Sequence, residues 1–203
     1  TDQQIAIPGE SGSIFDFDIS NVGESELYGL EIAAEFEATS ALSVFASLGL
    51  QRAQFTNFPF AVDRDPVTDE LVPVNPDFPR FAFLDGFDFP NAPSVTASAG
   101  FSYRHRSGFI ASGNAAYTGT RFQGVDNLPI EQAESLTLVN ARLGYRYETV
   151  EISVYANNLF DDRFLAPSVA NVNTGTGLPQ PSTAPEFSTN DPRLWGVELR
   201  ASF

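Results

Sequence analysis

The feature that most constrains this chain is an alternation of apolar and polar side chains with a period of two. Between residues 27 and 37, for example, apolar side chains occupy every second position from Tyr28 to Phe36. Successive side chains of a β-strand point to opposite faces, so this period predicts strands and leaves little room for helices. Strands are expected at 27–37, 42–51, 95–103, 109–122, 137–147, 150–157 and 193–203, with a weaker eighth candidate at 3–7.

The connections between these strands alternate between short and long. Those at 38–41, 104–108 and 147–150 are tight, whereas those at 8–20, 56–93, 122–135 and 161–192 are long and polar. Long structureless loops are uncommon in compact soluble domains. Outer-membrane barrels, in contrast, have short turns on one side and long loops on the other. We therefore predict an all-β, antiparallel transmembrane β-barrel segment of about eight strands, with short periplasmic turns and long extracellular loops.

Aromatic residues and charge support this prediction. Aromatic residues make up 13% of the chain, against 18% charged residues. Many lie close to expected turns or termini, where amphipathic rings form an interfacial girdle in membrane barrels: Phe36, Phe101, Tyr103, Phe109, Tyr145, Tyr147, Trp195 and Phe203. The formal net charge is -15 and every Lys/Arg cation is arginine. Such a chain repels phosphate backbones, which argues against nucleic acid as a partner.

Polar side chains on the other face of the strands are expected to point into the lumen. They can neutralise one another across strands, for example Arg142 or Arg146 with Glu151 or Glu198. Contact with a plug and water is the principal expectation for this face, and direct ligand contact a lesser alternative. The set is Glu31, Glu35, Gln51, Asn114, Asn140, Arg142, Arg146, Glu151, Asn157, Glu198 and Arg200.

The loop at 60–89 combines acidic and aromatic residues. Asp63 and Asp65, followed by Asp69 and Glu70, have a spacing similar to that of a calcium loop, but the glycine of an EF-hand turn is missing. A solvated acidic loop is the favoured interpretation, so no metal or other cofactor is predicted. The mixture also suits a lid that contacts a ligand, although loop packing alone would explain it. The candidate ligand contacts are Asp63, Asp65, Phe81, Phe83, Asp85 and Phe87.

No catalytic constellation is found, so an enzyme is not predicted. His105 is the only histidine and lies in the expected turn at 104–108, between two arginines. Serine–histidine chemistry needs a placed histidine. With no cysteine, disulfides, thiolate metal sites and cysteine nucleophiles are excluded.

Three segments resemble TonB-dependent outer-membrane receptors. "NVGESELYGLE" at 21–31 resembles the N-x-G…G-x-E start of a barrel strand in that family. "NNLFDDRF" at 157–164 is similar to its N-L-F-D-x-x-Y/F segment, and "PRLWGVELRASF" at 192–203 to its closing strand. The order of these segments fits, and the resemblance extends over nearly the whole chain.

The resemblance implies a 22-stranded barrel with an N-terminal plug and a TonB box. Such receptors import siderophores, cobalamin, haem or glycans with the help of TonB, ExbB and ExbD. Residues 1–203 are then expected to be the C-terminal portion of the barrel, without plug and TonB box. The resemblance further implies that alternate residues of the last strand are read by the barrel-assembly machinery and face outer-membrane lipid: Trp195, Val197, Leu199, Ala201 and Phe203.

Two alternatives to a receptor segment remain open from the sequence. One is a complete eight-stranded outer-membrane barrel with a structural or adhesive role, since eight strands can close. The other is a soluble β-sandwich that binds a partner. The identity of a ligand is not predicted.

Overall fold

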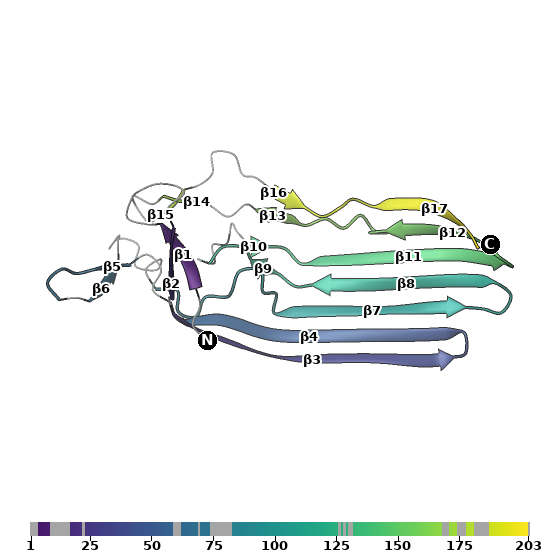
Figure 1. Ribbon diagram of the computed structural model, residues 1–203, viewed down its shortest axis with the longest axis horizontal. Coiled ribbons are helices and arrows are strands. Elements are labelled where there is room, and N and C mark those ends of the chain that lie inside the picture. The colour runs from purple at the N-terminus through teal and green to yellow at the C-terminus, as the bar shows by residue number, and fades with distance from the viewer. Residues whose placement is uncertain are drawn as a thin grey trace.

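The alternating segments pair as one antiparallel sheet of seven long strands in the computed structural model (Figure 1). The structure describes residues 4–8, 17–21, 23–58, 62–68, 70–73, 83–125, 127, 129, 132–167, 171–173, 178–180 and 187–202. The long strands are β3 (Glu24–Thr39), β4 (Leu42–Asn57), β7 (Val95–Arg104), β8 (Phe109–Thr118), β11 (Leu136–Tyr147), β12 (Val150–Asn157) and β17 (Leu194–Ala201).

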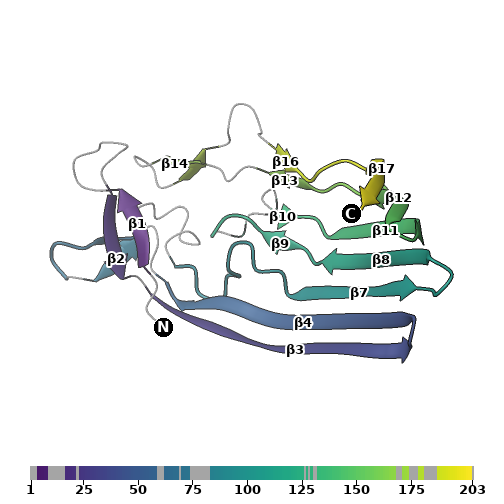
Figure 2. The ribbon, with the colours of Figure 1, turned by 45° about the vertical axis from the view of Figure 1, so that its right-hand side comes forward.

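The strand order is β17-β12-β11-β8-β7-β4-β3, so each long strand lies beside the long strand next to it in sequence. Three tight turns, between β3 and β4, β7 and β8, and β11 and β12, lie together at one end of the sheet (Figure 2). We call this the turn end, and the opposite end, where the long connections leave, the loop end. In the first turn the Thr39 hydroxyl accepts hydrogen bonds from the backbone N–H groups of Ala41 and Leu42. Gly108 closes the second turn with a φ of 97°, which glycine adopts without strain.

The long connections carry short two-stranded sheets of their own. The expected eighth strand forms, but it pairs outside the large sheet, which therefore has seven strands rather than eight. The short pairs are β1 (Gln4–Pro8) with β2 (Phe17–Asn21), β5 (Val62–Arg64) with β6 (Leu71–Pro73), β9 (Arg121–Phe122) with β10 (Gln132–Ala133), β13 (Leu165–Pro167) with β16 (Phe187–Thr189), and β14 (Asn171–Asn173) with β15 (Leu178–Gln180).

Two strand boundaries differ most from the sequence expectation. Strand β4 continues past residue 51 to Asn57, because its loop end pairs with the start of β3 and with the segment around Asp88. Strand β8 stops at Thr118 instead of reaching residue 122. Gly119 leaves the β8–β11 ladder, and its N–H donates to the carbonyl oxygen of Val95.

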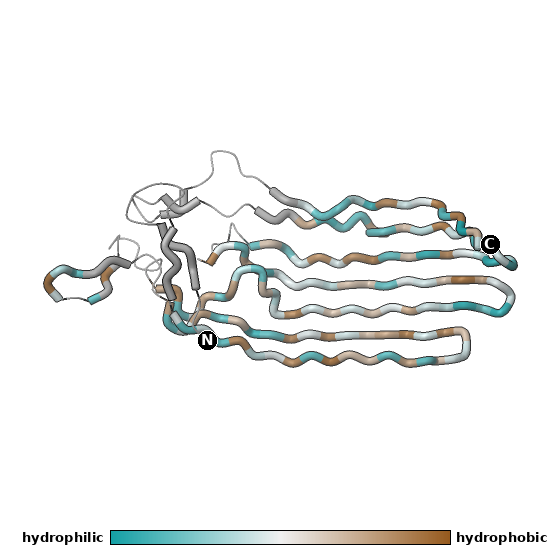
Figure 3. The backbone as a smooth tube through the Cα atoms, viewed as in Figure 1, coloured by the Kyte–Doolittle hydropathy of each residue, from teal (hydrophilic) through white to brown (hydrophobic). Residues whose placement is uncertain are grey.

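The register gives the sheet two distinct faces. One row across five strands is Ala34, Ala46, Ala99, Ala115 and Val139. We call this the apolar face, and the opposite one the polar face. The alternation along each strand is visible as changing colour in Figure 3. Large apolar side chains lie bare on the apolar face, as shown by the exposure of Leu199 at 70%.

Aromatic rings gather on the apolar face near the turn end, where the sequence predicts a girdle. The Tyr103 and Phe109 rings lie 6.2 Å apart, and Phe109 pairs with Tyr145 across the β8–β11 ladder. The alternation of large rings near the end and small residues in the middle is the pattern of a lipid-facing surface. Within the described part of the chain, no helix has both the length and the apolar character to cross a bilayer.

Burial is confined mainly to the loop end. There Phe55, Phe58 and Leu84 form a small core, against which Phe87 and Phe89 pack. The two edge strands, β3 and β17, each have a single neighbour among the described residues. The sheet is therefore open, with both edges and the apolar face available for further contacts.

Candidate functional site: the polar face and the loop end

The polar face carries hydrogen bonds between side chains of neighbouring strands. The hydroxyl oxygens of Ser47 and Ser98 lie 2.8 Å apart on neighbouring strands. The Nδ2 atom of Asn140 donates to Oδ1 of Asn114 over 3.4 Å. The register puts the polar residues expected in the lumen on this one face, as the sequence predicts.

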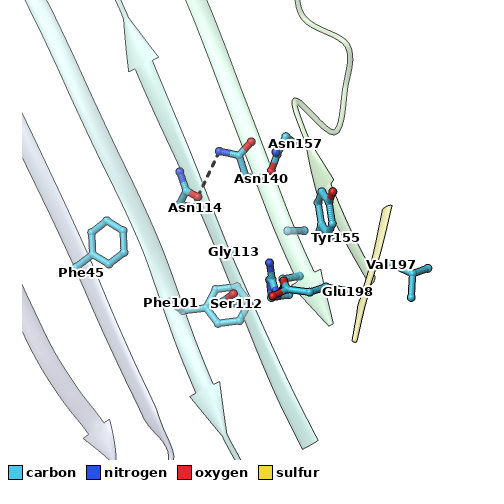
Figure 4. A pocket seen from close by; sticks show the side chains of 12 residues that line it. Phe45, Phe101, Ser112, Gly113, Asn114, Asn140, Tyr155, Asn157, Val197 and Glu198 are labelled. Carbon is cyan, nitrogen blue, oxygen red and sulfur yellow. Dashed lines mark hydrogen bonds and ion pairs between the residues drawn. The ribbon is translucent and has the colours of Figure 1, made fainter. Parts of the chain in front are cut away.

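A hollow of about 680 Å³ lies over β8, β11, β12 and β17 (Figure 4). Side chains from four strands turn toward it, among them Asn114, Asn140, Tyr155 and Glu198. The ring of Phe45 borders the hollow on its far side. Such a lining offers amide and charged groups together with aromatic surface, which is suited to contact with polar protein surface, water or a ligand.

Two salt bridges hold the charged part of this face. The Arg142 guanidinium donates to Oε2 of Glu198 at 2.6 Å, and Arg146 pairs with Glu151. These are two of the cross-strand pairings that the sequence predicts. Glu198 also accepts from Arg200 at 2.7 Å.

The pair of Arg142 and Glu198 reaches across an intervening strand. Arg142 belongs to β11 and Glu198 to β17, with β12 between them. On its way the guanidinium donates to the hydroxyl of Ser153 and lies 5.5 Å from the ring centroid of Tyr155. One side chain therefore ties three strands together on the polar face.

Aromatic rings cover glycines of neighbouring strands at two places on this face. A Cβ on Gly100 would lie 2.6 Å from Cζ of Phe45, and one on Gly196 would lie 2.7 Å from the hydroxyl of Tyr155. In each case ring and glycine are direct cross-strand partners. A ring that covers a strand glycine supplies packing that the glycine, which has no side chain, cannot provide.

The segment "NNLFDDRF" contacts Asn190 where β12 ends. We call Asn158, Asp161, Asp162 and Asn190 the clasp. Asn158 is buried, and its side-chain amide donates to the carbonyl oxygens of Asp162 and Asp191. Its oxygen accepts the N–H of Asp162. Asn158 has a φ of 49° and Asp161 one of 56°, a left-handed conformation that asparagine and aspartate tolerate better than most residues.

The clasp also connects the long β12–β17 loop to neighbouring strands. Asp162 accepts the N–H of Thr137 at the start of β11, and Asn190 accepts that of Phe164. Asp161 accepts the N–H of Arg193 at 2.8 Å just before β17. This backbone hydrogen bond, followed by that from Arg163, lowers the pKa of the Asp161 carboxyl below its ordinary value.

Four of the six candidate ligand contacts in the acidic loop have described side chains. Asp65 caps its own turn by accepting the N–H groups of Val67 and Thr68, which lowers the pKa of its carboxyl. Asp85 accepts the N–H of Phe58, and Phe87 packs on the core. Phe83 is 42% exposed.

The other two candidates lie beyond what the structure describes. Asp63 lies in β5, but its side chain is not described, and Phe81 lies outside the described residues. The ligand contacts of this loop therefore stay a prediction. Among the described residues, no group of three or more His, Asp or Glu side chains is arranged to hold a metal ion.

Strand β17 presents Trp195, Val197, Leu199 and Ala201 on the apolar face, where they pair with β12. Phe203 lies outside the described residues. A role of this row in barrel assembly also stays a prediction. His105 lies in the exposed turn after β7, where its Nδ1 is 2.8 Å from the hydroxyl of Ser107.

Comparison with known sequences identifies the class of protein that this two-faced sheet belongs to. The family model described as "TonB dependent receptor-like, beta-barrel" matches residues 1–159. The chain therefore belongs to the TonB-dependent receptor β-barrel family, as the three sequence segments suggested.

Solved structures of this family have the same fold. The ferric yersiniabactin uptake receptor FyuA from Yersinia pestis matches with a TM-score of 0.65 at 19% identity, over 92% of this chain and 25% of that one. BauA, the ferric preacinetobactin receptor from Acinetobacter baumannii, matches with a TM-score of 0.58 at 14% identity, over 99% and 26%. The copper transporter OprC gives 0.56 at 17%, over 98% and 27%. The chain thus spans about a quarter of the length of these structures.

Proposed function

We propose that this chain is the C-terminal part of an outer-membrane receptor that takes up a scarce ligand with TonB-derived energy. The observation that carries the proposal is the two-faced open sheet in a member of this family. One face is apolar and bare, as lipid contact requires, and the other carries paired charges suited to a wet lumen. Transport, rather than catalysis, is the role that follows.

The open edges support the proposal that the sheet is part of a larger barrel. An unpaired strand edge in a bilayer leaves backbone groups without partners, each at a cost of several kcal/mol. Strand β3 has sixteen residues and one neighbour among the described residues, and β17 does not pair with it. A self-contained small barrel would need that pairing, so the open order favours further strands elsewhere in the receptor.

In this arrangement the loop end faces outward and the turn end faces the periplasm. The long loops, including Asp63, Asp65, Phe81, Phe83, Asp85 and Phe87, take part in ligand capture. Ligand candidates are the classes taken up by such receptors, namely siderophores, cobalamin, haem or glycans. TonB, ExbB and ExbD act through the plug, and the barrel-assembly machinery reads the row from Trp195 to Phe203 in the last strand.

The experiment that tests this function is uptake by cells that lack the gene. Wild-type, gene-disrupted and complemented cells are compared for uptake of a panel of labelled ferric siderophores, cobalamin, haem and oligosaccharides, each in a TonB-positive and a TonB-negative background. We expect one ligand class to depend on both genes. Uptake of every ligand unchanged by loss of the gene would contradict the proposal.

Assembly is tested separately by deletion of Phe203 from the full-length protein. We expect less heat-modifiable barrel in the outer membrane at equal synthesis. A normal barrel level would show that the last residue is not part of the assembly signal.

A further inference from the structure

Arg121 is the one described residue with a buried side-chain nitrogen or oxygen atom that lacks a hydrogen bond. Its Nη1 atom is shielded from solvent and has no partner. Arginine stays charged under all physiological conditions, and a buried charged donor without a partner carries a larger penalty than a neutral one. Such a group in a native fold calls for a partner that is not part of the described chain.

The arginine is held in place from one side only. Its guanidinium carbon lies 5.2 Å from the ring centroid of Phe164, a distance at which ring and cation attract each other. Phe164 is itself fixed by the clasp, because its N–H donates to Asn190. The guanidinium is thus positioned on a platform, while its hydrogen-bonding edge remains unmatched.

Arg121 also lines a polar hollow of about 110 Å³ at the loop end. Its lining residues include Gln51, Gln132, Ser94 and Thr120, which carry amide and hydroxyl groups. This volume exceeds the roughly 30 Å³ that one water molecule occupies in the liquid. The hollow is therefore large enough for a carboxylate group and has donors around its wall.

The charges at the hollow favour an anion. Among the described residues, two arginines, Arg52 and Arg121, line it together with one aspartate, Asp88. Asp88 accepts a hydrogen bond from Gln54, which also binds Nε of Arg52. Among the described lining residues the charge balance is positive, in a chain whose formal net charge is -15. A water molecule in the hollow would leave this excess charge uncompensated.

From these observations we propose that the hollow at Arg121 binds a carboxylate group, with the guanidinium fork of Arg121 as its principal contact. Arginine matches a carboxylate with two parallel N–H donors. In the uptake reaction this would be an anionic group of the imported ligand, and that last step rests on the proposed function. Binding of a carboxylate does not depend on it.

The probe is succinate, and its neutral isostere succinamide is the control. The full-length receptor is purified in detergent, and its thermal midpoint and its calorimetric binding are measured at constant ionic strength. We expect succinate to raise the midpoint and succinamide not to. In Arg121→Gln the shift should vanish and the affinity fall at least tenfold. In Arg104→Gln, the same change at an exposed arginine of the turn end, both should persist.

Several outcomes would overturn the proposal. The first is an equal shift of the thermal midpoint by succinate and succinamide in the wild type. The second is an unchanged affinity for succinate in Arg121→Gln. The third is that succinate does not bind the wild type, while Arg121→Gln is less stable than the wild type. The last would mean that another part of the receptor fills the hollow. If Arg121→Gln does not fold, Arg121→Lys, which keeps the charge without the fork, is expected to bind more weakly.

The two proposals can fail independently. Succinate binding through Arg121 together with uptake that needs neither this gene nor TonB would retain the hollow and remove the proposed function. TonB-dependent uptake by a receptor that does not bind succinate would do the reverse.

Discussion

Asn158 is the buried side chain of the clasp, with three hydrogen bonds, and it is the residue we expect to be least replaceable there. It binds one end of the β12–β17 loop near Asp162 and the other end at Asp191. Its left-handed backbone conformation adds a second requirement that few residues other than asparagine and glycine meet.

We therefore predict that Asn158→Ala opens the loop end of β12 and β17. Loss of hydrogen bonds by a buried amide typically costs about 1–3 kcal/mol. Hydrogen exchange of the full-length receptor, followed by mass spectrometry, should show faster exchange in the segment 158–193. The control is Asn157→Ala, a neighbouring exposed asparagine. Equal exchange in the two variants would contradict a special role of Asn158.

Asp161 predicts a pH dependence of the same loop. Its folded pKa is lowered, mainly by the backbone N–H of Arg193. A carboxyl with a lowered folded pKa stabilises the fold above its unfolded pKa, near 3.8, and this contribution is lost as the pH falls through the lower folded value. Exchange at Arg193 should thus become faster below about pH 4. In Asp161→Asn this acid-dependent step should be absent, whereas a step of equal size in the variant would exclude Asp161 as its source.

Residue-scale features of the site were only partly predictable. "NNLFDDRF" is recognisable as a family segment. Asn158 and Asn190, however, are separated by a long loop in the sequence, and no local pattern predicts that they lie in the same clasp. Arg121, Asp88 and Gln132 are likewise scattered along the chain. The cross-strand salt bridges were predictable, because strand register follows from the alternation of faces.

At the scale of the strands, the contact of Arg142 with Glu198 joins β11 to β17 over β12. Both side chains are about one-third exposed, so solvent weakens their attraction. We therefore expect a small favourable coupling between the two side chains, of the size found for exposed ion pairs.

This coupling can be measured by a double-mutant cycle of Arg142→Met and Glu198→Gln, with urea unfolding of the full-length receptor in detergent or lipid. The same cycle of Arg142→Met with Glu35→Gln, an acid on the same face but on β3, serves as control and should give no coupling. Coupling equal to that of the control would mean that the pair contributes only through its individual residues.

Strand boundaries were predictable where the alternation persists and not where tertiary contacts replace it. The segment 52–57 breaks the simple lipid-facing pattern, since Phe55 turns into the core made with Phe58 and Leu84. The 3–7 segment has the alternation of a strand, yet it pairs with β2, because a pattern of faces does not specify which partner a strand takes.

At the scale of the whole molecule, the apolar face has the height that a bilayer requires. Strands β7 and β8 have ten residues each. At about 3.3 Å per residue such a strand is about 33 Å long, and a tilt of about 40° leaves about 25 Å across the membrane. Ala99 lies near the middle of β7 on this face.

The proposed contact of this face with lipid predicts that the free energy of unfolding depends strongly on which side of the strand carries a charge. Ala99→Arg should destabilise the barrel in lipid by about 2–4 kcal/mol, as arginine does at the bilayer midplane. Ser102→Arg, on the polar face of the same strand, should cost far less. The free energies of unfolding in lipid vesicles provide the measurement, and equal costs for the two variants would contradict a lipid-facing apolar surface.

The sheet order has a consequence for the route by which the sheet is made. Because every long strand adjoins its sequence neighbour, no long strand needs a partner that is distant in the sequence in order to pair. The three tight turns close loops of a few residues, whereas the other connections close loops of up to 37 residues, between Asn57 and Val95. Closing the longer loops costs about 2 kcal/mol more in chain entropy. The hairpins β3–β4, β7–β8 and β11–β12 are therefore expected to form first. They then join edge to edge, so that the sheet grows by association of preformed hairpins.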